Sequence, residues 1–86
     1  MANDDLRALI RTIPDFPKPG ILFRDITTLL LDADGFAAAV ERMAVALPEA
    51  PDLIAGIDAR GFVFAAALAQ RLHRGLLLIR KDGKLP

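Results

Sequence analysis

The pattern of apolar and polar residues in the first third of the chain predicts a short helix, a rigid loop and an extended segment. The helix would follow two aspartates at positions 4 and 5, which suit the positive end of a helix, and would end at Pro14. Residues 14–20 hold three prolines and one glycine and are predicted to form a rigid loop before an extended segment over residues 21–26. The apolar positions at helical spacing are Leu6, Leu9, Ile10 and Ile13.

A longer helix is predicted over residues 36–47. Asp32 and Asp34 offer N-terminal caps before this segment, and Pro48 would end it. The apolar stripe that would face the core consists of Phe36, Val40, Met43 and Leu47.

The second half of the chain has two continuous apolar runs, residues 53–57 and 76–79, separated by an apolar, alanine-rich stretch over residues 61–72. Short runs without polar alternation are typical of parallel strands that are covered on both faces. The intervening stretch has the length of a helix, which Gly75 would end. The pattern therefore predicts a βαβ unit and an α/β fold with a partial parallel sheet.

Composition narrows the classes of function. Eleven basic and eleven acidic side chains cancel, which argues against a general binder of nucleic acid or anionic lipid. The absence of cysteine excludes disulfides, thiolate metal sites and a cysteine nucleophile. The uninterrupted apolar stretch at residues 61–69 is far shorter than the ~20 residues of a membrane span, and the acidic N-terminus resembles no targeting signal. We therefore expect a cytoplasmic protein without a membrane partner.

A parallel sheet would bring two loops to the same edge. Because both strands run the same way, the loops after Ile57 and Ile79 would open beyond the carboxyl ends, where ligands bind in open α/β sheets. The first loop opens a helix whose N-terminal N–H groups and Arg60 favour an anion. The second loop adds three cations, Arg80, Lys81 and Lys84. Such a local concentration of positive charge suits a phosphate or pyrophosphate group.

Several of these residues also have a structural interpretation. Arg60 could be a solvated residue at a helix start, and the second loop could be a solvated terminal loop. Asp58 could form a strand-end turn, or it could face a metal ion or a substrate hydroxyl. The five phenylalanines are expected to lie mostly in the core, Phe23 being the questionable one, and His73 at a helix end is given no catalytic role.

Three segments resemble one enzyme family. Residues 14–26, Pro-Asp-Phe-Pro-Lys-Pro-Gly-Ile-Leu-Phe-Arg-Asp-Ile, resemble the N-terminal signature of the adenine phosphoribosyltransferases. Residues 56–62, Gly-Ile-Asp-Ala-Arg-Gly-Phe, are similar to the pyrophosphate loop of that family, and residues 79–86, Ile-Arg-Lys-Asp-Gly-Lys-Leu-Pro, to its next segment. The resemblance covers most of the chain in the family's order, and it implies a Rossmann-like phosphoribosyltransferase fold.

The resemblance also implies a reaction of purine salvage. In that reaction the phosphoribosyl group of 5-phosphoribosyl-1-pyrophosphate passes to adenine, giving AMP and pyrophosphate, with Mg²⁺ bound together with the phosphoribosyl substrate in a cytoplasmic homodimer. By position, adenine would bind at Leu22, Phe23 and Arg24, with the Phe23 ring on the base and main-chain groups of its two neighbours at the base edge. The peptide between Asp58 and Ala59 would be cis. The residues that would bind pyrophosphate are Asp58, Ala59, Arg60, Arg80, Lys81 and Lys84.

Part of the family's site has no counterpart in these 86 residues. The chain lacks the segment with a Glu-Tyr pair and the Val-Val-Asp-Asp…Ala-Thr-Gly-Gly-Thr loop that holds the ribose, its 5-phosphate and the metal, and Ala65 stands where the family has a glycine. We therefore expect the N-terminal half of one domain, truncated after the βαβ unit. Residues 1–35 would form the first helix and the adenine loop, and residues 36–86 the helix and βαβ core. No catalytic residue or metal ligand is expected in this half, and the isolated chain is expected to be inactive.

An alternative from another class of function is a non-catalytic interaction module. An unfinished parallel sheet has an unpaired edge, which can pair with a second copy or with a full-length relative.

Overall fold

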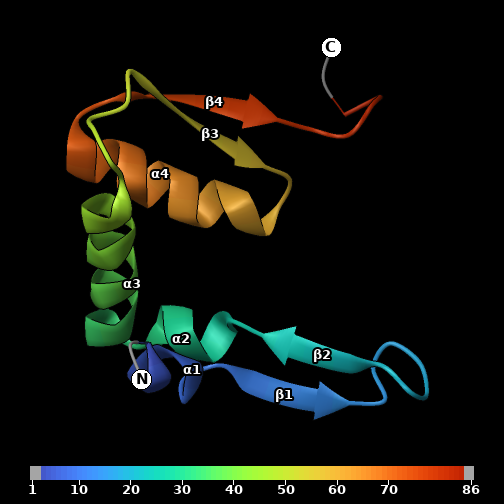
Figure 1. Ribbon diagram of the computed structural model, residues 1–86. Coiled ribbons are helices and arrows are strands. Elements are labelled where there is room, and N and C mark those ends of the chain that lie inside the picture. Colours follow the sequence, from blue (N-terminus) through green and yellow to red (C-terminus); the bar gives the residue numbers. More distant parts are fainter. Residues whose placement is uncertain (1–2, 85–86) are drawn as a thin grey trace. The chain divides into compact units, whose positions relative to one another are not determined.

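The computed structural model describes residues 3–84, in which helices and strands follow the order α1, β1, β2, α2, α3, β3, α4, β4 (Figure 1). The chain divides into two compact units, Met1–Ala39 and Val40–Pro86. The first contains an antiparallel pair of strands and the second a parallel pair. Leu85 and Pro86, which end the third family-like segment, lie outside the described residues. The assignment of residues 1–86 to one domain stays a prediction.

The first unit begins with a helix that is shorter than predicted. Helix α1 covers only Asp4–Arg7, and strand β1 follows at Arg11–Pro14, so the prediction of a helix up to Pro14 was wrong. Strand β1 pairs antiparallel with β2, Leu22–Asp25, which confirms the extended segment. Two β-branched residues in β1 favour a strand. The strand that pairs with β1 follows the proline-rich loop, so the spacing of apolar residues before Pro14 gave no sign of the pairing.

The proline-rich segment connects these two strands as a closed loop. The Phe16 N–H donates to the Ile21 carbonyl over 3.2 Å, and the Gly20 N–H donates to Asp15 Oδ1 over 2.9 Å. Gly20 has a φ of 88°, a conformation that favours glycine. The predicted rigid loop is therefore confirmed, except that Pro14 belongs to β1.

Asp25 links the strand pair to helix α2, Thr27–Leu31, from a buried position. Its carboxylate accepts hydrogen bonds from the Thr27 hydroxyl at 2.7 Å, the Thr27 N–H at 2.9 Å and Arg11 Nε at 3.1 Å. These bonds stabilise the ionised form, with the Thr27 side chain contributing most, and lower the pKa of Asp25 to about 2. Asp25 therefore ties together three successive elements of the unit.

Helix α3 spans Ala33–Ala46 and begins three residues before the predicted start. Asp32 caps it, because its Oδ2 accepts the Gly35 N–H over 2.7 Å. The buried residues of α3 are Gly35 and Ala39 rather than the predicted apolar stripe, of which Met43 is 41% exposed.

The predicted βαβ unit is confirmed. Strand β3 covers Leu53–Ile57, helix α4 covers Arg60–Leu72, and strand β4 covers Gly75–Ile79. The strands are parallel and in register from Leu53 opposite Gly75 to Ile57 opposite Ile79. The prediction that Gly75 ends α4 was wrong, because Gly75 begins β4. The helix ends at Leu72, and its C-cap residue His73 has a left-handed conformation with a φ of 56°.

The core of the second unit lies between β3 and α4. Ile54, Ala65 and Ala69 are buried there, with Leu68 and Leu72 packed against them. At Gly56 an added Cβ would lie 2.6 Å from the Cβ of Ala65, so the close approach of strand and helix requires glycine.

Burial differs from the sequence-based expectation in two ways. None of the five phenylalanines is buried, since Phe16 is 50% exposed and the other four are half-buried. The parallel sheet was expected to be covered on both faces, yet Leu53 and Ile57, which alternate with the buried positions of β3, are 53% and 66% exposed. Helix α4 thus covers one face of β3, whereas within the described residues β4 is exposed on both faces. No helix of residues 3–84 has the length and apolar character needed to cross a bilayer.

Candidate functional site

The candidate anion site begins where β3 and β4 end side by side. The Asp58 N–H donates to the carbonyl of Ile79, the last residue of β4, over 3.0 Å, which continues the pairing one residue past the end of β3. The loops that follow the two strands therefore start at adjacent points, as the parallel arrangement predicted.

The first of these loops leads directly into α4. The Asp58–Ala59 peptide is cis, as the family resemblance implied, and Ala59 occupies the N-cap position. Alanine has no side-chain acceptor, so the cap residue does not compete with an anion for the first N–H groups of the helix. Arg60, the first residue of α4, is exposed, and this arrangement favours an oxyanion near the helix start.

The second loop contacts the first through Arg80. Its Nε lies 3.4 Å from Asp58 Oδ2, and its Cζ lies 5.8 Å from the centre of the Phe62 ring. The Asp58 side chain is 13% exposed and that of Arg80 34%. Asp58 is thus both a strand-end turn residue and an acceptor for Arg80.

The two predicted lysines lie on a tight turn after Arg80. The Lys84 N–H donates to the Lys81 carbonyl over 3.2 Å, and Gly83 inside this turn has a φ of 84°. Both lysines are exposed. The turn follows Arg80 directly, so the loop presents its three cations within five residues of sequence at the end of β4.

The predicted base-binding residues lie on β2, in the other compact unit. The Phe23 ring packs edge-to-face on that of Phe16, with 5.3 Å between ring centroids. Leu22 lies opposite Pro14, which has no N–H to donate to it. Among the described residues, β2 has β1 as its only strand neighbour, so one edge of β2 is open.

Leu22 and Arg24 are two residues apart on this strand, so their main-chain polar groups point to the same edge. The Arg24 side chain donates to the Thr12 hydroxyl and is thereby tied to β1. The geometry allows one strand to offer both an aromatic ring and main-chain donors and acceptors to a planar base.

Sequence reasoning missed two aromatic partners of these sites. Phe62 and Phe16 were expected in the core, whereas their rings contact Arg80 and Phe23. Phe62 lies two residues after the start of α4 and next to the candidate loop, and this position was the feature that could have indicated a role in the site. Its partner comes from the next strand, so the contact could not be seen locally.

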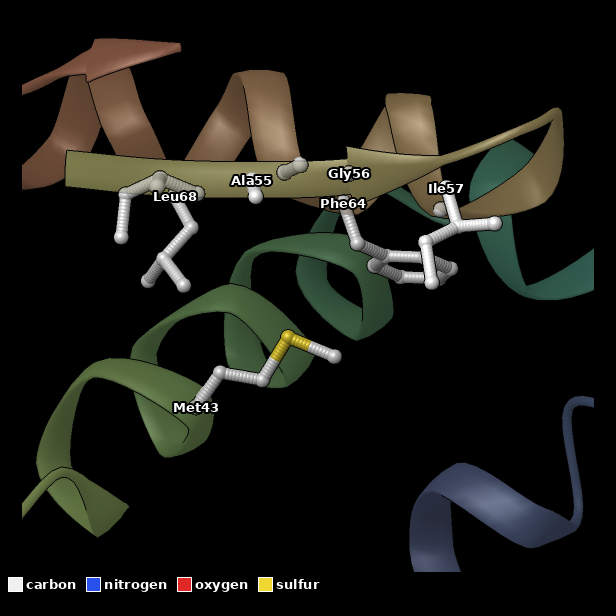
Figure 2. Close-up of a pocket in the computed structure, with 9 residues that line it drawn as sticks. Met43, Ala55, Gly56, Ile57, Phe64 and Leu68 are labelled. Carbon is white, nitrogen blue, oxygen red and sulfur yellow. The ribbon is translucent and has the colours of Figure 1, made fainter. Parts of the chain in front are cut away.

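A separate apolar pocket of about 330 Å³ lies within the second unit. Figure 2 shows Met43 of α3 and Phe64 and Leu68 of α4 around it, beside Ile57 of β3. Its lining consists only of apolar residues and glycines, so it supplies no acid, base or metal ligand.

Residues 3–84 contain no group of three or more histidine, aspartate or glutamate side chains placed to hold a metal ion. Asp58, the carboxylate in the candidate anion site, is paired with Arg80.

Comparisons with individual known sequences and structures agree with these motifs. No family model matches the chain. The adenine phosphoribosyltransferase of Synechococcus sp. (strain JA-3-3Ab) is 58% identical over 84 residues, covering 95% of this chain and 48% of the relative. The crystal structure of the enzyme from Thermoanaerobacter pseudethanolicus has a TM-score of 0.89 at 51% identity, covering 96% of this chain and 50% of that one.

The enzyme from Giardia lamblia, solved with 9-deazaadenine, has a TM-score of 0.89 at 37% identity, covering all of this chain and 48% of its own. The chain thus spans about half the length of the curated relatives it matches. The sequence alignment and the structural alignment each cover nearly the whole chain. The chain is therefore homologous to the N-terminal half of the adenine phosphoribosyltransferases.

Proposed function

We propose that this chain supplies the base-binding and pyrophosphate-binding parts of an adenine phosphoribosyltransferase. The reaction would transfer the phosphoribosyl group of 5-phosphoribosyl-1-pyrophosphate to adenine, forming AMP and pyrophosphate in purine salvage. The observation that carries the proposal is the junction of the two loops, where Asp58 bonds to Ile79 and Arg80 reaches Asp58.

Pyrophosphate would bind where these loops meet. As the bond to the ribose breaks, negative charge grows on the departing pyrophosphate, and preorganised donors lower the barrier by stabilising that charge. Here the donors would be the N–H groups at the start of α4 together with Arg60, Arg80, Lys81 and Lys84. Mg²⁺ would enter with the phosphoribosyl substrate, as the family resemblance implies.

Adenine would bind along β2. The Phe23 ring, supported by Phe16, would pack on the base, and main-chain groups of Leu22 and Arg24 would read its edge. The relative from Giardia lamblia was solved with 9-deazaadenine, a close analogue of adenine, which supports an adenine-like base as the ligand. Holding the base in place would favour its attack on the ribose by reducing the entropy lost in the reaction.

The assembly would be a cytoplasmic homodimer, as the family resemblance implies. The 86 residues alone would not turn over substrate, because they contain no counterpart of the segment that holds the ribose 5-phosphate. AMP formation from adenine and 5-phosphoribosyl-1-pyrophosphate tests this point directly. Clear turnover by a polypeptide of verified 9.3 kDa mass would contradict it.

Binding of inorganic pyrophosphate tests the anion site in the chain itself. Titration followed by amide NMR should shift signals of residues 58–62 and 80–84, and Arg60→Gln should weaken binding about tenfold, as expected for one charge-assisted contact. Arg7→Gln removes the same charge from an exposed position in α1 and should leave binding unchanged. Equal effects of the two variants would mean that pyrophosphate responds only to net charge.

One observation favours the interaction module as a second candidate. The exposed face of β3 and β4 carries Leu53, Ile57, Leu77 and Ile79, between 44% and 66% exposed. Sedimentation of the chain alone and mixed with a full-length relative would distinguish the two candidates. A chain that stays monomeric in both samples would count against the module.

A further inference from the structure

Within residues 3–84, Arg80 contacts Asp58 and Phe62, and these two differ in their relation to an anionic ligand. The first is the Asp58 carboxylate, 3.4 Å from Arg80 Nε, which lies at the long end of hydrogen-bonding distances. The second is the Phe62 ring, whose centre lies 5.8 Å from Arg80 Cζ, within the range of a cation–π contact. Each contact lies near the long end of its range, so the guanidinium group is held by the two together.

Phe62 is well placed to hold Arg80. It is half-buried in the first turn of α4, where its own N–H donates to the Ala59 carbonyl over 3.1 Å. Its ring is therefore attached to the helix start that would face the pyrophosphate. The guanidinium has five N–H donors, and the Asp58 contact uses one of them.

The two neighbours would respond differently to an incoming pyrophosphate. Asp58 carries the same sign of charge as the ligand, so the two compete for the Arg80 cation. Phe62 is neutral and attracts the cation through its ring face, so its contact persists while an oxyanion binds the guanidinium N–H groups. An arginine already held over the helix start loses less conformational freedom when the ligand arrives.

We propose that Phe62 is a positioning residue that holds the Arg80 guanidinium at the start of α4 for the pyrophosphate group of the substrate. This inference rests on the proposed function, because it takes the pyrophosphate site as given. Phe62 does not touch the ligand itself but acts through Arg80.

The test begins without ligand. The ring current of Phe62 should shift the side-chain proton signals of Arg80 upfield, and Phe62→Leu should remove that shift. With inorganic pyrophosphate, Phe62→Leu should weaken binding about fivefold, the equivalent of about 1 kcal/mol for a partly exposed cation–π contact. Phe62→Tyr keeps the ring and should bind like the unaltered chain, whereas Phe36→Leu makes the same change in α3 and should have no effect.

A double-mutant cycle separates positioning from a structural role. If Phe62 acts through Arg80, Phe62→Leu should cause no further loss of affinity in an Arg80→Gln background. Phe62→Met keeps the apolar volume without the ring, and it replaces Phe62→Leu if that variant fails to fold. A loss that persists in the Arg80→Gln background, or unchanged affinity in both ringless variants, overturns the inference while the pyrophosphate site stands. Failure of the unaltered chain to bind pyrophosphate would instead overturn the proposed site and this inference with it.

Discussion

Replacing Gly56 by alanine should destabilise the β3–α4 contact far more than replacing Gly61. A Cβ at position 56 would lie 2.6 Å from the Cβ of Ala65 and 2.9 Å from the Gly61 carbonyl oxygen, well inside the ~3.5–4.0 Å of normal carbon contacts. At Gly61 the nearest atom to an added Cβ is 3.8 Å away. The same chemical change therefore meets a closed space at one glycine and an open one at the other.

The size of the effect follows from two opposing contributions. Overpacking a closely packed site costs about 1–3 kcal/mol, while replacing glycine by alanine restricts the unfolded chain and returns about 0.4–1 kcal/mol. For Gly56→Ala the net loss of unfolding free energy is about 1–2 kcal/mol, which lowers the melting temperature of a chain of this length by roughly 5–15 °C. For Gly61→Ala only the favourable contribution applies, so the melting temperature should rise by a few degrees.

Thermal unfolding followed by circular dichroism measures both variants. Ala65→Gly in the Gly56→Ala background removes the closest clashing methyl group, so it should recover part of the loss, although the same change alone costs about 1 kcal/mol in a helix interior. The reasoning is refuted if Gly56→Ala melts at or above the unaltered chain, or if the two losses simply add.

Three further predictions concern other parts of the chain. Ionised Asp25 should stabilise the first unit fully above about pH 4, and this stabilisation should be lost as the pH falls towards the folded pKa of about 2. Acid titration followed by amide NMR signals should show the loss in the unaltered chain and not in Asp25→Asn. Asp32→Ala removes the cap of α3 and should lower the unfolding free energy in urea by about 1 kcal/mol, against a smaller effect of Asp34→Ala in the first turn. Gly83→Ala places a side chain at a φ of 84° and should distort the turn that carries Lys84. Calorimetry should then show weaker pyrophosphate binding, while the amide signals of α4 in the ligand-free chain stay unchanged.

A different result would contradict each of the predictions for Asp25, Asp32 and Gly83. Equal acid sensitivity of the unaltered chain and Asp25→Asn would show that other carboxylates dominate. Equal effects of the two α3 variants would assign the loss to helix charge rather than to the cap. Unchanged pyrophosphate affinity in Gly83→Ala would remove the turn from the site.

Elements that local sequence specifies were predicted correctly, whereas those that depend on contacts between distant residues were not. Strand β3 and helix α4 were predicted within a residue at each end, because continuous apolar runs and a helical stretch of sufficient length specify them locally. Strand β1 was mistaken for helix, since Ile10 and Ile13 fit a helical stripe and only pairing with β2 reveals the strand.

In the candidate site too, one feature was predicted from the sequence and another depended on a contact between distant residues. The edge at which Asp58 and Arg80 meet followed from parallel topology alone, and the structure places both residues there. The aromatic partner Phe62 was not found, because a half-buried phenylalanine at a helix start gives no sign of which cation will lie over it.

The sequence by itself determined the βαβ order, the loop edge and the three segments that mark the family, because each depends on residue types within a short span. Only the tertiary structure decided that Arg11–Pro14 is a strand, that Gly56 must be glycine and that Phe62 lies against Arg80. These features depend on contacts between residues far apart in the chain, whose positions are set once the elements pack. The even balance of charge says nothing of where cations gather, whereas the ends of β3 and β4 place them at one edge.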